Sequence, residues 1–148
     1  MFENCSYSAR GTLSTKGLAL LGFLIAAALL LTPRPARDDL STAEGRCGYI
    51  ARCGWDAAPE SEELREIELP ESFDRVLEDY NAMQLAQGYD LREAAGKRCL
   101  CCSYELRSYP GWDGRVIATI YIYRSRVIGG DIHTADISGF MRPLRDAP

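Results

Sequence analysis

The sequence predicts an α+β domain in which an antiparallel meander of three to four strands packs against an amphipathic helix, preceded by an N-terminal transmembrane or signal-anchor helix. Three observations predict this class: an uncharged apolar run near the N-terminus, apolar residues at helical spacing in mid-chain, and strand-like alternation after them. A chain of 148 residues with 47% hydrophobic and 26% charged residues is typical of one globular domain with an appendage.

The apolar run "GLALLGFLIAAALLL" follows a short tail of residues 1–16 and forms the predicted membrane segment, residues 17–32. Pro33 and Pro35 end it, because proline cannot continue a helix. Its length leaves both a cleaved signal peptide and an uncleaved anchor open. No small-x-small cleavage site follows, so we favour an uncleaved, single-pass anchor over a signal peptide or a buried helix of a soluble core.

Basic residues lie on both sides of this segment, so the positive-inside rule does not fix its orientation. A short tail inside and the whole domain outside is the simplest arrangement, and it predicts an extracytoplasmic domain at the cell membrane. From Arg34 onward, 20 acidic residues outnumber 15 basic ones, which argues against a nucleic-acid partner.

A polar linker, residues 33–40, leads into a domain predicted over residues 41–143, and a tail follows at 144–148. The stretch "STAEGRCGYIARCGW" predicts a short helix, which begins at a capping box of Ser41 and Glu44 and ends before Gly54. The stretch "EELREIELP" predicts a strand that ends at Pro70.

The clearest helix is predicted in "ESFDRVLEDYNAMQLAQG", which Gly88 ends. Its apolar residues recur at helical spacing and are expected to pack on the sheet. They are Phe73, Val76, Leu77, Tyr80 and Met83.

Strands follow this helix. In "KRCLCCSYELRSYP" the alternation places Leu100, Cys102, Tyr104 and Leu106 on one face. After a turn at 110–114, "RVIATIYIY" predicts a central strand covered on both faces, and a tight reversal at "RSR" leads into "VIGGDIHTADISGF". Gly129 and Gly130 predict a bulge or a close backbone approach.

The blocks "FDRVLEDYNAMQLAQGYDL", "SYELRSYPG" and "YIYRSRVIGGDIHTADISGFM" resemble a bacterial family, domain of unknown function 4830, over roughly residues 47–141. The resemblance implies a small protein with an N-terminal hydrophobic segment, a cell-envelope address in Gram-positive-type bacteria, and no known activity. Where the family's strand carries basic and aromatic residues, this chain has Leu100, Cys101 and Cys102. A function of these cysteines common to the family is therefore not implied.

The stretch "RCLCC" places Cys99, Cys101 and Cys102 within four positions. A zinc site needs ligand pairs joined by a turn, and a strand holds Cys99 and Cys101 too far apart, so no metal site is predicted. A disulfide joining Cys47 or Cys53 to Cys99 or Cys101 stays open for a domain outside the cell. The favoured interpretation is that the thiols fill small apolar positions.

The only histidine, His133, lies in "GGDIHTAD", where alternation places it on the same strand face as Asp131, with Asp136 shortly after. These three residues form the candidate binding cluster. One histidine excludes a two-histidine metal centre within a single chain. A Ser or Cys nucleophile with His133 as its base stays open, although no nucleophile motif accompanies it.

Two classes of function follow. The favoured one is a non-catalytic binding or protein-interaction module of the bacterial cell envelope, without a cofactor, for an unknown protein or small-molecule ligand. The alternative is an envelope enzyme, a hydrolase or a thiol enzyme, that uses His133 or a cysteine. A hydrogen bond between His133 and a serine or cysteine in a pocket would favour the enzyme.

Overall fold

The computed structural model describes residues 38–136 and 138–145. The predicted membrane segment at 17–32 lies outside the described residues. Within the described part of the chain, no helix has the length and apolar character needed to cross a membrane.

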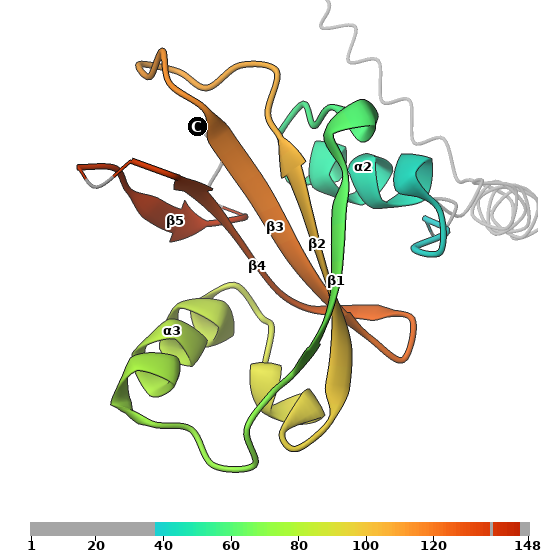
Figure 1. Ribbon diagram of the computed structural model, residues 1–148, viewed down its shortest axis with the longest axis vertical. Helices are drawn as coiled ribbons and strands as arrows, with labels where there is room; N and C mark the ends of the chain where they lie inside the picture. Colours follow the sequence, from blue (N-terminus) through green and yellow to red (C-terminus); the bar gives the residue numbers. More distant parts are fainter. Residues whose placement is uncertain (1–37, 137, 146–148) are drawn as a thin grey trace, which may run out of the picture. The chain divides into compact units, whose positions relative to one another are not determined.

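A five-stranded antiparallel sheet in the order β1-β2-β3-β4-β5 forms the centre of the domain (Figure 1). The elements are α2 (Ala43–Arg52), the 3-10 helix η1 (Pro59–Ser61), β1 (Glu63–Glu68), α3 (Arg75–Ala86), the 3-10 helix η2 (Leu91–Ala94), β2 (Arg98–Glu105), β3 (Val116–Tyr123), β4 (Arg126–Thr134) and β5 (Met141–Pro143). The α+β class is therefore confirmed. The prediction of three to four strands missed β5, because three residues are too few to show alternation.

The larger core lies between α2 and one face of the sheet. Cys102, Tyr104, Ala118, Ile120 and Ile132 are buried on this face and belong to one cluster with the α2 residues. This packing confirms the face predicted for β2, because Cys102, Tyr104 and Leu106 belong to the cluster and Leu100 packs against it. The cluster extends to Leu144, which the sequence assigned to the tail but which is fully buried.

Helix α2 begins one residue later than predicted. The side chain of Thr42 caps it by accepting the Gly45 N–H at 3.1 Å. Ser41 does not cap, because its hydroxyl and its N–H both donate to Asp39. The end at Gly54 is as predicted, with a positive φ of 97° that favours glycine.

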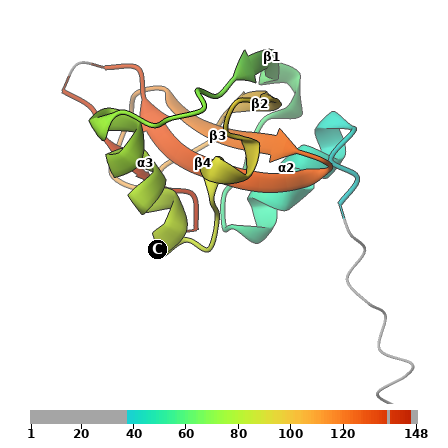
Figure 2. The ribbon, with the colours of Figure 1, turned by 90° about the horizontal axis from the view of Figure 1, so that it is seen from below.

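Helix α3 belongs to a second, smaller core, on the other face of the sheet. Leu91, Ala94, Cys99 and Ile128 are buried in this cluster, with Leu77 partly buried against it. Figures 1 and 2 show α2 and α3 packed against separate parts of the twisted sheet. Helix α3 covers only one end of this face of the sheet, and the other end of the face is left uncovered.

The predicted apolar stripe of α3 is only partly correct. Val76 is 76% exposed, and the fully buried residues of the helix are the amides Asn81 and Gln84. Gln84 accepts the Gly130 N–H at 2.8 Å, and Gln87 donates to the Gly130 carbonyl at 3.1 Å. The short β5 pairs only with residues 131–133, so the two glutamines take its place along the edge of β4.

Both glycines predicted to mark a bulge or close approach lie in tight surroundings, and the backbone contact makes glycine necessary at Gly130. A Cβ on Gly129 would lie 2.7 Å from Leu91, and one on Gly130 would lie 2.9 Å from the Thr119 carbonyl oxygen. The β3–β4 register shifts between Tyr121 and Ile122, which is the predicted bulge.

Candidate binding site on the open face of the sheet

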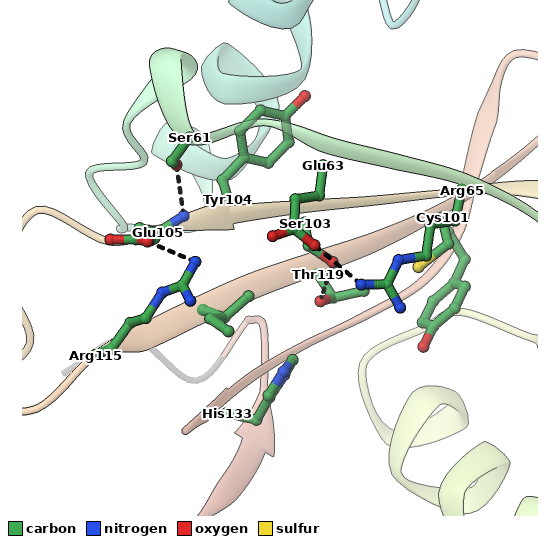
Figure 3. Close-up of a pocket in the computed structure, with 12 residues that line it drawn as sticks. Ser61, Glu63, Arg65, Cys101, Ser103, Tyr104, Glu105, Arg115, Thr119 and His133 are labelled. Carbon is green, nitrogen blue, oxygen red and sulfur yellow. Dashed lines mark hydrogen bonds and ion pairs between the residues drawn. The ribbon is translucent and has the colours of Figure 1, made fainter. Parts of the chain in front are cut away.

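The part of the sheet that α3 leaves uncovered forms a pocket of about 390 Å³ (Figure 3). Its floor consists of cross-strand pairs between β2 and β3, Cys101 with Tyr121 and Ser103 with Thr119. His133 on β4 lines it as well. The alternation of four strands therefore brings polar side chains from distant parts of the sequence to one surface.

His133 is held by a buried carboxylate. Its Nδ1 lies 2.6 Å from Oδ1 of Asp131, which is only 1% exposed. The hydrogen bond from His133 to Asp131 raises the pKa of the imidazole, and burial opposes this rise only in part. Because an ionised carboxylate cannot donate, Nδ1 carries the proton and Nε2 is left for other partners.

Helix α3 supplies the second partner of Asp131. The Tyr80 hydroxyl donates to Oδ2, so both oxygens of this buried carboxylate are satisfied. Burial raises the pKa of Tyr80 well above its ordinary value, and the negative charge of Asp131 raises it further, so the hydroxyl stays a donor. From its place on the apolar stripe, Tyr80 was expected only to pack on the sheet. The available signal was that a tyrosine on an apolar stripe usually has a partner for its hydroxyl.

Two exposed ion pairs flank the pocket. Arg65 lies 3.0 Å from Glu63 on β1, and Arg115 lies 2.5 Å from Glu105 at the opposite end. All four side chains are more than 40% exposed, so the pairs hold the arginines only weakly. Either guanidinium can therefore turn toward a ligand.

Asp136 is not part of this pocket. It is exposed beyond the end of β4, and its carboxylate lies beside Gly114. The chain turns away after β4, where Thr134 exchanges backbone and side-chain hydrogen bonds with Phe140. Of the predicted cluster, the structure brings together Asp131 and His133.

The structure does not pair the cysteines proposed for a disulfide. Cys47 and Cys53 pack on the α2 side, whereas Cys99 belongs to the core on the α3 side and Cys101 lines the pocket. The five cysteines in the described residues are free thiols. Burial raises the pKa of each, to about 11 for Cys99 and about 12 for Cys102, so they are protonated near neutral pH.

The geometry lacks an activated nucleophile. Within the described part of the chain, no serine or cysteine lies within hydrogen-bond distance of His133, whose bond goes to Asp131. Ser103 shares its hydrogen bond of 3.0 Å with Thr119. Nor do the described residues contain a group of three or more His, Cys, Asp or Glu side chains that could hold a metal ion. The arrangement can orient a ligand but has no base and nucleophile in contact.

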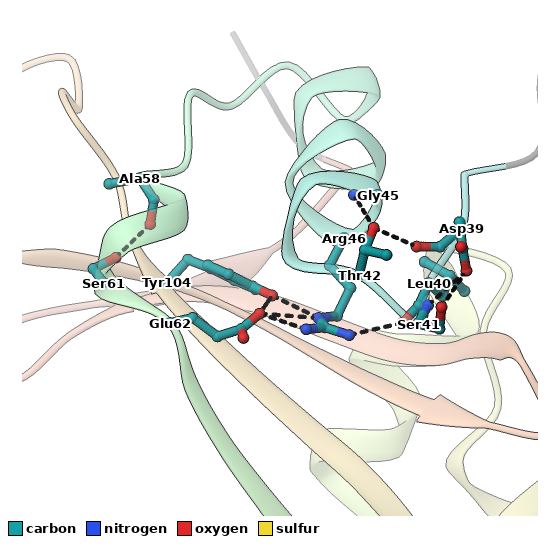
Figure 4. Close-up of polar contacts among 10 residues, drawn as sticks. All are labelled: Asp39, Leu40, Ser41, Thr42, Gly45, Arg46, Ala58, Ser61, Glu62 and Tyr104. Atoms are coloured by element: carbon teal, nitrogen blue, oxygen red, sulfur yellow. Dashed lines mark hydrogen bonds and ion pairs between the residues drawn. The ribbon is translucent and has the colours of Figure 1, made fainter.

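A buried ion pair that the sequence did not predict lies under α2 (Figure 4). Arg46 is 4% exposed and lies 2.6 Å from Glu62, while its Nε donates to the Tyr104 hydroxyl at 2.7 Å. Burial favours a higher pKa for Glu62, but the hydrogen bonds from Tyr104 and Arg46 outweigh it and lower the pKa. Arg46 precedes the buried Ile50 by one helical turn, and this spacing was the available signal. These contacts join α2 to the sheet and have no part in the pocket.

In comparisons with known proteins, no family model, no curated protein and no solved structure matches this chain. What the pocket does must therefore be inferred from its own chemistry.

Proposed function

We propose that this chain is a membrane-anchored, extracytoplasmic protein of the bacterial cell envelope whose domain is a non-catalytic binding module. The uncharged apolar run within residues 17–32 supports the anchor. The resemblance to the family of domain of unknown function 4830 supports the envelope address. The lack of contact between His133 and a nucleophile supports binding over catalysis.

The proposed ligand site is the pocket on the open face of the sheet, and the observation that carries it is the contact between His133 and Asp131. A ring fixed by a buried carboxylate loses little freedom when it binds a ligand. The raised pKa of His133 increases the fraction of molecules whose imidazole is protonated and therefore has an N–H donor at Nε2. With Arg65 and Arg115 beside it, the pocket suits a small polar molecule that carries an anionic group.

The ring of His133 provides a direct test, because this is the only histidine in the chain and its imidazole resonance needs no assignment. The full chain in nanodiscs is titrated with succinate, inorganic phosphate and the neutral polyol glycerol. We expect a saturable shift of the histidine resonance with one or both anions and none with glycerol. A difference between succinate and phosphate would identify the anionic group.

Variants show whether such a shift comes from this pocket. Asp131→Asn should weaken anion binding about tenfold, since a neutral amide holds the ring less firmly and no longer raises the pKa of His133. Asp136→Asn, a change of the same kind outside the pocket, should leave it unaltered. Equal effects of the two variants, or no shift with either anion, would refute the proposal.

A further inference from the structure

A second hollow lies between α3 and β5, apart from the pocket on the sheet. It has a volume of about 750 Å³ and is lined mainly by apolar side chains, among them Val76, Leu77 and Met83 of α3 and Met141 of β5. Val76 is 76% exposed and Met141 is 54% exposed. Two of the most exposed large apolar side chains of the described domain therefore face the same groove.

Such a surface is unfavourable in water unless something covers it. Surface positions of a helix normally carry polar residues, and a continuous exposed apolar patch on a monomer is typical of an interaction site. Met83 and Met141 both line the groove, and flexible, polarisable methionine adapts to partners of differing shape. Burying such side chains against a partner is favourable by the hydrophobic effect.

The charge of the rim indicates what kind of partner fits. Asp74 and Asp79 line the groove, and among the described residues no basic side chain lines it. Asp74 is the N-cap of α3, where its Oδ1 accepts the Leu77 N–H, and it lines the groove. Asp79 has only a distant ion pair, at 4.0 Å, with the exposed Arg75. A partner with lysine or arginine beside its apolar side chains would meet both carboxylates.

We propose that the groove between α3 and β5 docks an amphipathic segment of another protein, in which apolar side chains are flanked by basic residues. This inference goes beyond the proposed ligand pocket and uses different residues, apart from Tyr80, which contacts both regions. A two-fold contact with a second copy would set Asp74 and Asp79 against the same acids. An anionic lipid surface would be repelled by them.

The test uses the full chain in nanodiscs of zwitterionic lipid and two labelled helical peptides of about 18 residues, or five turns. Both peptides carry leucine on one face, and the other face carries lysine in one peptide and glutamate in the other. Fluorescence anisotropy measures binding. We expect the lysine peptide to bind at least about tenfold more tightly than the glutamate peptide at low salt, and salt to reduce this preference.

Substitutions locate the bound peptide. Val76→Gln and Met141→Gln should each weaken binding of the lysine peptide about tenfold. Leu85→Gln is the matched control, because Leu85 is 50% exposed on the same helix but does not line the groove. Asp74→Asn combined with Asp79→Asn should remove the preference for lysine, and asparagine preserves the helix cap. All variants share the same nanodiscs, so differences among them do not come from peptide binding to lipid.

Several results would overturn the proposal. It fails if Val76→Gln and Leu85→Gln have equal effects, or if the two peptides bind equally well. It also fails if the groove is already occupied. A dimer of the full chain that Val76→Gln dissociates would identify a second copy as the occupant. Binding to empty anionic vesicles that Val76→Gln abolishes would identify a lipid surface. Because His133 lies outside the groove, either result leaves the anion titration of the pocket unaffected.

Discussion

At the scale of single residues, one buried carboxylate on β4 links helix α3 to the pocket. Asp131 on β4 accepts hydrogen bonds from Tyr80 of α3 and from His133 in the pocket. A carboxylate this deeply buried is tolerated because both oxygens have partners. Replacing Tyr80 or His133 would therefore leave one buried oxygen of Asp131 without a hydrogen-bond donor.

The link between Asp131 and His133 predicts a pH dependence of stability. The folded state raises the pKa of His133 above its ordinary value of 6.5, so the folded state binds the proton more tightly than the unfolded chain does. The resulting stabilisation is fully present below pH 6.5 and is lost as the pH rises through the raised value. Urea unfolding of the wild type and of His133→Gln across this range should show a difference that shrinks with rising pH. A difference independent of pH would contradict the link.

The buried ion pair under α2 predicts a large effect of one exchange. Arg46→Ala should cost about 3 kcal/mol, because Glu62 and the Tyr104 hydroxyl lose their cationic partner in a largely buried place. Arg75→Ala on α3 is the control. Its pair with Asp79, at 4.0 Å, is exposed on both sides and should contribute less than about 1 kcal/mol. Chemical denaturation of both variants decides, and similar losses would show that the Arg46 pair is not special.

At the scale of elements, α3 is held to the sheet by amides as well as by apolar contacts. Gln84 and Gln87 bond the backbone of Gly130 where β5 has already ended. Asn81 accepts the Leu91 N–H at 2.8 Å and so fixes the start of η2. Side chains of the helix and its C-cap thus satisfy backbone groups of β4 that a neighbouring strand would otherwise bond.

This role predicts that an apolar exchange in α3 destabilises the domain. Gln84→Leu has a similar volume but leaves the buried Gly130 N–H without an acceptor, at a cost of about 1 to 3 kcal/mol. Leu85→Gln, one position further along, changes an exposed side chain and should stay within about 0.5 kcal/mol. Thermal unfolding compares the two. A neutral Gln84→Leu would mean that another group or water satisfies Gly130.

The sequence predicted the elements better than their contacts. Period-two alternation identified the buried face of β2 because the larger core covers Cys102 and Tyr104 on it. The stripe of α3 misplaced Val76 because helical spacing shows which residues share a face but not how far a sheet extends beneath it. Burial of Gln84 depends on a backbone group 46 residues away, which no local pattern contains.

The candidate site likewise contains residues that the sequence could predict and one that only the fold brings there. Asp131 and His133 stand two apart on one strand, so alternation alone places them together. Tyr80 completes the cluster from 51 residues away and could be found only in the folded chain. Asp136 lies past the strand end, where alternation no longer applies.

At the scale of the whole molecule, the proposed anchor predicts where the protein is found. The full chain should sediment with membranes, and protease added to intact cells should digest its domain. Removing residues 17–32 should release the protein from the membrane fraction, since no described helix could replace the anchor. A cytoplasmic marker that stays intact serves as the control. A soluble, protease-protected full-length chain would refute both anchor and orientation.

The outer strand β1 has a consequence for chains held at high density. It has a neighbour on one side only, so its other edge presents unpaired backbone groups on which further strands could grow into filaments. Four of its six residues are charged, Glu63, Arg65, Glu66 and Glu68, and five of the six are exposed. Stacking another strand there would strip water from these charges. The domain can therefore be crowded on a surface without polymerising through its open edge.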